Sequence, residues 1–208
     1  MVVELPMFPL GTVLLPHMAL PLHVFEPRYR ALVSDVLAED GRFGVTLIRR
    51  GSEVGGGDER FTVGTTARIA HAEQLEDDRW LLIALGEQRV RIDRWLDDSP
   101  YPTASVEPLP DRHDGIRVGE LHERLLPRIR RVLELQQRIE GNGSLPSDTD
   151  LLDDPEITCW QDPAVSPVTP LDRQRLLETD DCAARLELLD DLLVGTEEVL
   201  TFRLLDEP

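Results

Sequence analysis

The chain contains no lysine, and all 22 of its basic residues are arginine. A phosphate-binding P-loop needs a lysine to reach the nucleotide phosphates, and Schiff-base catalysis needs a lysine amine. The sequence therefore excludes a P-loop ATPase site and a lysine-dependent covalent mechanism within these 208 residues.

Cysteine is nearly as scarce. Cys159 and Cys182 are far apart in the sequence and fit neither a CxxC motif nor a zinc-ligand spacing. A chain of 208 residues buries enough surface to fold without disulfides. We predict that both cysteines are free buried thiols.

The chain also lacks an uninterrupted apolar helix. Residues 5–25 carry no charged side chain, but Pro6, Pro9, Pro16 and Pro21 interrupt them. Each proline removes a backbone donor and clashes with the preceding turn, so this segment is predicted to form two or three strands rather than a membrane helix. No basic n-region or cleavage signal accompanies it, so we expect a cytoplasmic protein without membrane association.

Acidic residues outnumber basic residues by 40 to 22, which gives a net charge of -18. Nucleic-acid binding depends on a positive surface, so no nucleic-acid partner is expected. RNA binding is nevertheless kept as an alternative function, because the sequence contains two local groups of arginines. They are Arg49 and Arg50 at the end of one predicted strand, and Arg89, Arg91 and Arg94 on another.

Motifs of catalysis are missing. The five histidines form no HExxH motif or other compact zinc spacing: His17, His23, His71, His113 and His122. No metal or cofactor is predicted.

Serine nucleophiles have no local support either, because there is no GxSxG motif and no base beside Ser34, Ser52 or Ser105. Triads are recognised by geometry, so a cryptic hydrolase remains a third hypothesis. No catalytic residue is predicted.

The first half of the chain reads as strands with one helix. Glu26 before Pro27 starts a helix that ends at Gly41, and residues 43–48 return to a strand. Residues 61–69 alternate as in a half-buried strand, and residues 80–85 form an apolar run typical of a strand buried on both faces and broken by Gly86. Short strands around residues 90–92 and 104–107 complete a sheet of about six strands, enough for a small barrel.

The second half reads as helical after a proline-rich linker at residues 108–115. An apolar stripe from Gly119 predicts an amphipathic helix of about 20 residues, kinked or broken at Pro127. Residues 141–170 are polar and rich in proline, and we expect them to be partly mobile.

Two further helices are predicted near the C-terminus. Thr169 and Asp172 form a cap for the first, and Thr179 or Asp180 caps the last. In the last helix, four acidic residues are predicted to form a solvated face: Asp190, Asp191, Glu197 and Glu198.

Several segments together carry a family resemblance: LPMFPLGTVLLPHMALPLHVFEPRYRAL, then FGVTLI, GSEVG and VGTTARI, and later PLDRQRLLETDD and RLELLDDLL. They resemble the N-terminal substrate-binding domain of Lon proteases, in its short stand-alone form. The resemblance implies an α+β fold with a PUA-like β pseudo-barrel of about six strands and one inserted helix at residues 1–110. A helical subdomain would follow at residues 119–208, with a short helix around Trp160 and the mobile segment at 141–170.

The resemblance also implies a function. It implies a non-catalytic module that binds unfolded or exposed apolar polypeptide segments, or a separate protease component. The complete Lon protease pairs a catalytic serine with a lysine, which this lysine-free chain cannot supply. We therefore expect ATP-independent substrate recognition and no enzyme activity.

The motif FEPRYR is the candidate site. Phe25 and Tyr29, with Met18 and Leu20, are predicted to border a shallow groove that accepts an apolar polypeptide segment.

The same motif also permits a purely structural interpretation. Glu26 and Pro27 would open the helix, with Glu26 accepting backbone N–H groups, while Arg28 and Arg30 pair with carboxylates. In that interpretation the ring of Tyr29 packs against the barrel.

Overall fold

The structure, a computed structural model, describes residues 3–51, 53, 57–140 and 154–206. The chain divides into two compact units, Met1–Pro110 and Asp111–Pro208. Each unit is described by itself below.

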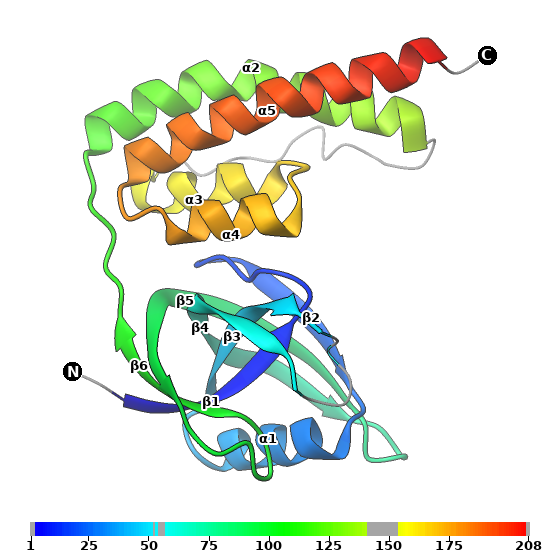
Figure 1. Ribbon diagram of the computed structural model, residues 1–208, viewed down its shortest axis with the longest axis vertical. Coiled ribbons are helices and arrows are strands. Elements are labelled where there is room, and N and C mark those ends of the chain that lie inside the picture. The colour runs from blue at the N-terminus through cyan, green and yellow to red at the C-terminus, as the bar shows by residue number, and fades with distance from the viewer. Residues whose placement is uncertain (1–2, 52, 54–56, 141–153, 207–208) are drawn as a thin grey trace. The chain divides into compact units, whose positions relative to one another are not determined.

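The first unit is a mixed sheet with one inserted helix (Figure 1). Its elements are β1 (Val3–Leu10), β2 (Ala19–Val24), α1 (Pro27–Ala38), β3 (Arg42–Arg50), β4 (Glu59–Gln74), β5 (Trp80–Trp95) and β6 (Thr103–Pro108).

The strand order is β2-β5-β4-β3-β1-β6, and β6 also pairs with β5. Strand β1 runs parallel to β3 and antiparallel to β6, so β5, β4, β3, β1 and β6 close a ring of hydrogen bonds with β2 added to the first half of β5. The predicted α+β class and the six-stranded barrel with one inserted helix are confirmed.

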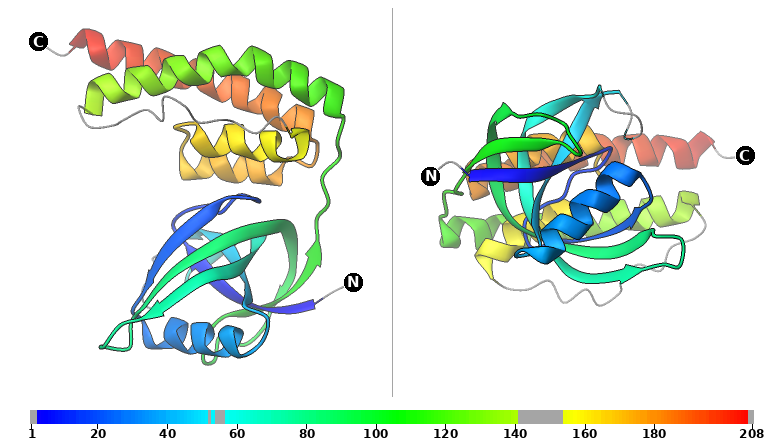
Figure 2. Two further views of the ribbon diagram at one scale, coloured as in Figure 1. Left: turned by 180° about the vertical axis from the view of Figure 1, so that it is seen from behind. Right: turned by 90° about the horizontal axis from the view of Figure 1, so that it is seen from below.

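Helix α1 lies across one end of the barrel, as both side views show (Figures 1 and 2). Pro27 occupies its first turn, where a missing N–H costs nothing. The buried face of α1 packs on the barrel strands. That face consists of Tyr29, Leu32, Val33 and Val36.

Strand β5 differs from the prediction in two ways. It continues through Gly86 instead of ending there. The missing side chain leaves room for the carbonyl oxygen of Leu15, since an added Cβ would lie 2.3 Å from that oxygen. Its first half is also not buried on both faces, because Leu81, Ile83 and Leu85 point outward and are more than 40% exposed. An all-apolar run hides which alternate residues face the core.

The second unit is helical. Its elements are α2 (Gly115–Glu140), α3 (Pro155–Val165), α4 (Pro170–Glu178) and α5 (Cys182–Asp206). Helices α2 and α5 lie side by side in both figures. No helix among the described residues has the length and apolar character needed to cross a bilayer.

Helix α2 starts four residues earlier than predicted and continues through Pro127. A proline inside a helix costs about 3 kcal/mol. Burial of Leu125, Ile129 and Val132 on either side of Pro127 offsets that cost.

Part of the segment expected to be mobile is a helix. Asp154 caps α3 by accepting the N–H of Glu156, and Trp160 is only 2% exposed, so burial of a large aromatic side chain fixes residues that look polar in sequence. The short helix around Trp160 is therefore present, and residues 141–153 lie outside the described residues.

The caps of the last two helices match the prediction only in part. Thr169 caps α4, and its Oγ1 accepts the N–H of Asp172 at 3.2 Å, as the sequence predicts. At α5, Asp181 accepts the N–H of Ala184 at 2.9 Å, so a residue next to the two predicted caps binds the first turn of the helix.

Two members of the predicted acidic face of α5 bind arginines of α2. Asp190 pairs with Arg124 at 3.4 Å and with Arg128, and Glu197 pairs with Arg131 at 3.7 Å. These two residues are therefore half-buried and ion-paired rather than fully solvated, because the adjacent helix supplies complementary cations. Asp191 and Glu198 are exposed.

A buried arginine organises the centre of the helical unit. Arg185 is fully buried and lies over the ring of Trp160, with 3.4 Å between its guanidinium carbon and the ring centroid. Its Nε donates to the carbonyl of Leu176 at 3.0 Å, and its Nη2 donates to the carbonyl of Thr179 at 2.6 Å and to Asp111 at 2.5 Å.

Candidate functional site

Strand β2 is an edge strand. Among the described strands it pairs only with β5, so its other edge has no strand partner. An unpaired edge presents N–H and C=O groups that another extended chain can bind.

The outward residues of β5 form an exposed apolar row beside β2. Leu81, Ile83 and Leu85 are 41%, 44% and 44% exposed, and Pro21 and His23 of β2 lie opposite Ile83 and Leu81. A row of large apolar side chains on one face is typical of an interaction surface.

Two cavities flank β2 and share Pro21, Leu22 and His23. One, of about 260 Å³, is lined by Leu20, Phe25 and Tyr29 among others. The other, of about 390 Å³, is lined by apolar residues of β2 and β5 and by His71. We call β2 and its surroundings the β2 surface, defined as residues 20–25 with Leu81, Ile83 and Leu85.

The structure brings three of the four predicted groove residues to one cavity. Phe25 is 53% exposed, Leu20 is partly buried and Tyr29 is only 3% exposed. Met18 packs against the same core but does not line this cavity. Sequence reasoning missed Leu81, Ile83 and Leu85, because nothing in their apolar run signals which residues face solvent.

Tyr29 is built into the core. Its ring stacks on Phe8 at 4.1 Å between centroids and 11° between planes, and the guanidinium of Arg28 lies 4.4 Å from its centroid. Burial raises the pKa of Tyr29 to about 12, although the positive charge of Arg28 opposes the rise.

The charged residues of the FEPRYR motif pair as predicted, except at the helix start. Arg28 binds Glu26 at 3.2 Å and the carbonyl of Glu53 at 2.9 Å, and Arg30 binds Asp78 at 3.8 Å. The predicted cap by Glu26 is wrong, because its side chain makes no cap hydrogen bond and its carboxylate is turned to Arg28.

Alkaline pH offers a direct test of this packing. Burial also raises the pKa of Tyr101 to about 12, and its hydroxyl donates to Asp35 at 2.8 Å. These are the two tyrosines of the chain, and without lysine no other side chain has an ordinary pKa near 10. Tyrosinate absorbance is therefore expected to rise near pH 12 in the folded protein and near pH 10 in denaturant.

Stability should follow the same window. The folded pKa of Tyr29 lies above the unfolded value, so its contribution is fully present below pH 10 and is lost as the pH rises towards 12. For Tyr29 this amounts to roughly 2 to 3 kcal/mol, and Tyr29→Phe should remove that share of the pH dependence. Titration of both tyrosines near pH 10 in the folded protein would contradict the packing of Tyr29.

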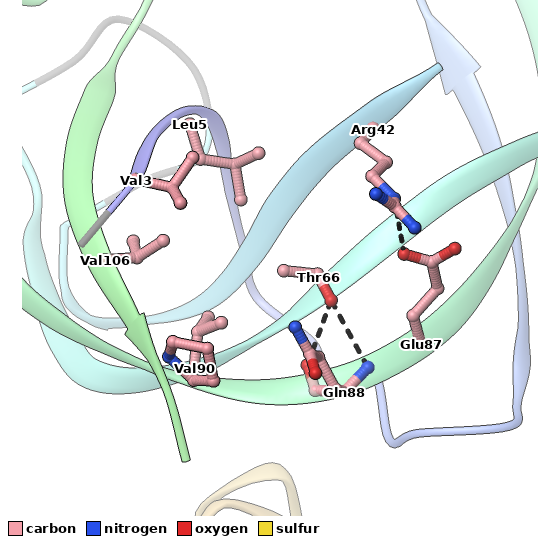
Figure 3. A pocket seen from close by; sticks show the side chains of 9 residues that line it. Val3, Leu5, Arg42, Thr66, Glu87, Gln88, Val90 and Val106 are labelled. Atoms are coloured by element: carbon pink, nitrogen blue, oxygen red, sulfur yellow. Dashed lines mark hydrogen bonds and ion pairs between the residues drawn. The ribbon is translucent and has the colours of Figure 1, made fainter. Parts of the chain in front are cut away.

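A further cavity of about 360 Å³ lies elsewhere in the barrel unit (Figure 3). The charged residues drawn there, Arg42 and Glu87, pair with each other at 2.9 Å. Thr66 Oγ1 donates to the carbonyl of Gln88 and accepts its N–H, both at 3.2 Å. The polar lining residues are therefore bound to one another, the other lining residues are apolar, and the set contains no nucleophile with an adjacent base.

The geometry bears unevenly on the predicted alternatives, because four of the five arginines named for RNA binding are exposed: Arg49, Arg50, Arg91 and Arg94. Arg89 is 1% exposed and donates to the carbonyl of Pro110 at 3.1 Å, so it is not available to a phosphate. Ser34 donates to the carbonyl of Arg30 in its own helix at 3.0 Å, Ser105 is buried, and Ser52 lies outside the described residues.

Curated relatives are Lon proteases. The chain is 30% identical over 203 residues to the Lon protease of Anaeromyxobacter dehalogenans and 27% identical over 204 residues to that of Escherichia coli. The alignments cover 94% and 95% of this chain but only 24% and 25% of those proteins, so the chain spans about a quarter of their length.

Solved structures agree with the fold. The Lon N-terminal domain protein from Xanthomonas campestris matches with a TM-score of 0.63 at 27% identity, over 90% of this chain and 96% of that chain. The N-terminal domain of Lon protease from the Mycobacterium avium complex matches with a TM-score of 0.68 at 20% identity, over 92% and 98% of the two chains.

The family model that matches covers both units. Its description is the ATP-dependent protease La (LON) substrate-binding domain, and it matches residues 4–195. The closed barrel with its inserted helix, the four helices that follow and the matched residues agree on one assignment: the chain belongs to the Lon substrate-binding domain family.

Proposed function

We propose that the barrel unit is a non-catalytic module that binds exposed apolar segments of other polypeptides at the β2 surface. The observation that carries this proposal is an unpaired edge strand lying between two cavities and beside an exposed apolar row. The name of the matching family, a substrate-binding domain, supports it.

The arrangement suits an extended ligand. A bound segment would hydrogen-bond to the free edge of β2, while its alternate side chains enter the cavities on either side of the strand. Phe25 offers an exposed ring at the end of β2, and Ile83 lies at the middle of the apolar row. This mode needs no catalytic group.

Charge favours a basic flank on the ligand. The chain carries a net charge of -18, and Glu53 lines the cavity beside Phe25. Arginine or lysine residues next to the apolar segment would therefore be attracted, with an effect that weakens as salt is added.

The proposed function also concerns a partner of this module. The relatives named Lon protease are about four times longer than the aligned region, which covers 24% of the first of them. We infer that the domain delivers unfolded or tagged polypeptides to a proteolytic partner, through recognition that does not itself consume ATP.

Peptide binding to surface variants tests the proposal. Fluorescein-labelled apolar peptides with basic flanks should bind the wild-type chain, and Phe25→Ala or Ile83→Ser should each weaken binding about tenfold, as expected for a central apolar contact. Both side chains are about half exposed, so the variants should keep the wild-type circular dichroism spectrum and Tm.

Phe202→Ser is the matched control. Phe202 is an apolar residue of α5 that is 65% exposed and lies outside the β2 surface. Equal binding by all four proteins, or equal loss in the control, would overturn the proposed site. Retention of RNA at low salt in place of peptide would favour the nucleic-acid alternative.

A further inference from the structure

Two thiols lie against each other in the core of the helical unit. The Sγ atoms of Cys159 in α3 and Cys182 at the start of α5 are 3.1 Å apart, and both residues are fully buried. The prediction of free buried thiols is confirmed, but 22 intervening residues hide the fact that the fold brings the two together.

The pair lies against a buried cation. Arg185 Nη1 is 3.4 Å from Cys159 Sγ and 3.5 Å from Cys182 Sγ, so the guanidinium directs N–H groups at both sulfurs. A cation held against sulfur stabilises the thiolate, which is the form that reacts as a nucleophile.

The two sulfurs are not equivalent. The hydrogen bond from Cys159 and the charge of Arg185 lower the pKa of Cys182, although burial opposes this. The pKa of Cys159 is raised by its hydrogen bond to Cys182 and by burial. These directions favour the thiolate at Cys182 and the proton at Cys159.

An exposed histidine covers the nucleophile. The Nδ1 atom of His113 lies 3.2 Å from Cys182 Sγ, and His113 is exposed to solvent. His113 is thus an exposed side chain in direct contact with a sulfur that is itself buried.

We propose that Cys159 and Cys182 form a redox switch, in which a hydroperoxide oxidises them to a disulfide that joins α3 to α5. In the first step the Cys182 thiolate attacks one oxygen of the peroxide, the O–O bond breaks and Cys182 becomes a sulfenic acid, while the leaving hydroxide or alkoxide takes up a proton from solvent and departs as water or an alcohol. In the second step Cys159 sulfur attacks Cys182 sulfur, the S–O bond breaks and water leaves with the proton of Cys159. Reduction by a dithiol returns two thiols.

A metal site explains the same residues less well. The ligand atoms of His113, Cys159 and Cys182 lie within 4.8 Å of one another. However, structural zinc sites use four ligands, and a divalent cation placed between these sulfurs would face the guanidinium that already contacts both of them. The arginine remains compatible with a disulfide, because its charge is paired with Asp111.

Peptide mapping of the oxidised wild-type chain tests the switch. The reduced protein is treated with hydrogen peroxide under native conditions, quenched, alkylated and digested. We expect both thiols to be lost together, the intact mass to fall by two hydrogen atoms, and a peptide linking Cys159 to Cys182 that dithiothreitol removes. No thiol loss unless denaturant is present would overturn the proposal, as would intermolecular linkage only.

Two matched variants separate the roles. Cys159→Ser should accumulate a dimedone-reactive sulfenic acid at Cys182, whereas Cys182→Ser should leave Cys159 unreacted. Reaction of Cys159 in the second variant as fast as in the wild type would overturn the assigned order. Zinc ions alone form the last arm: one tightly bound zinc per chain that blocks alkylation of both thiols would replace the switch with a metal site.

Discussion

Replacing Arg185 by lysine is expected to lower the free energy of unfolding of the helical unit by about 3 kcal/mol. The guanidinium donates to Leu176, Thr179 and Asp111 and also contacts both cysteine sulfurs. A guanidinium has five N–H donors in a planar fork, and an ammonium group has three at a single point. Lysine would therefore leave buried acceptors unpaired and would lose the flat contact with Trp160.

Urea denaturation followed by helical circular dichroism measures this effect, and Arg124→Lys provides the control. The side chain of Arg124 is 61% exposed and pairs with Asp190 at 3.4 Å, so the same chemical change there should alter the stability by less than about 0.5 kcal/mol. If both substitutions proved equally mild, the buried network would not be what holds α3, α4 and α5 together.

Replacing Tyr29 by alanine is expected to destabilise the barrel unit by about 3 to 5 kcal/mol, as large-to-small changes of buried aromatic residues do. The ring is 3% exposed and stacks on Phe8, so alanine would leave a cavity between α1 and the strands. Tyr29→Phe keeps the stacked ring and should cost little at neutral pH.

Phe25→Ala is the matched control for Tyr29→Ala, because the two aromatic residues line the same cavity and differ in burial. Thermal unfolding followed by near-ultraviolet circular dichroism should show a large fall in Tm for Tyr29→Ala and almost none for Phe25→Ala. Of these two variants, only Phe25→Ala is thus expected to weaken peptide binding while keeping an intact fold. A folded Tyr29→Ala variant with normal Tm would show that the FEPRYR motif does not lock α1 to the barrel.

Local chemistry made much of the fold predictable. Prolines in residues 5–25 excluded a long helix there, Pro27 marked the first turn of α1, and Thr169 with Asp172 marked the start of α4. In each case one residue type restricts the backbone or caps a helix whatever the tertiary surroundings.

Features that depend on tertiary contacts were not predictable. The outward row of Leu81, Ile83 and Leu85 lies in an apolar run without alternation, so the sequence does not show which face meets solvent. The contact between Cys159 and Cys182 depends on how α3 and α5 pack. The groove residues were predicted from the motif alone, and their role in binding stays a prediction.

Asp111 and Arg112 precede α2 in the sequence but bind residues at the start of α5. The N–H of Arg112 donates to the carbonyl of Asp180 at 2.9 Å, the N–H of Cys182 donates to the carbonyl of Arg112 at 3.0 Å, and Asp111 holds Arg185. A fragment that began at Gly115 would contain the sequences of α2, α3, α4 and α5 but would lack Asp111. The buried charge of Arg185 would then have lost its carboxylate partner. A fragment of this half is therefore expected to be more stable when it starts at residue 111, ahead of its first helix.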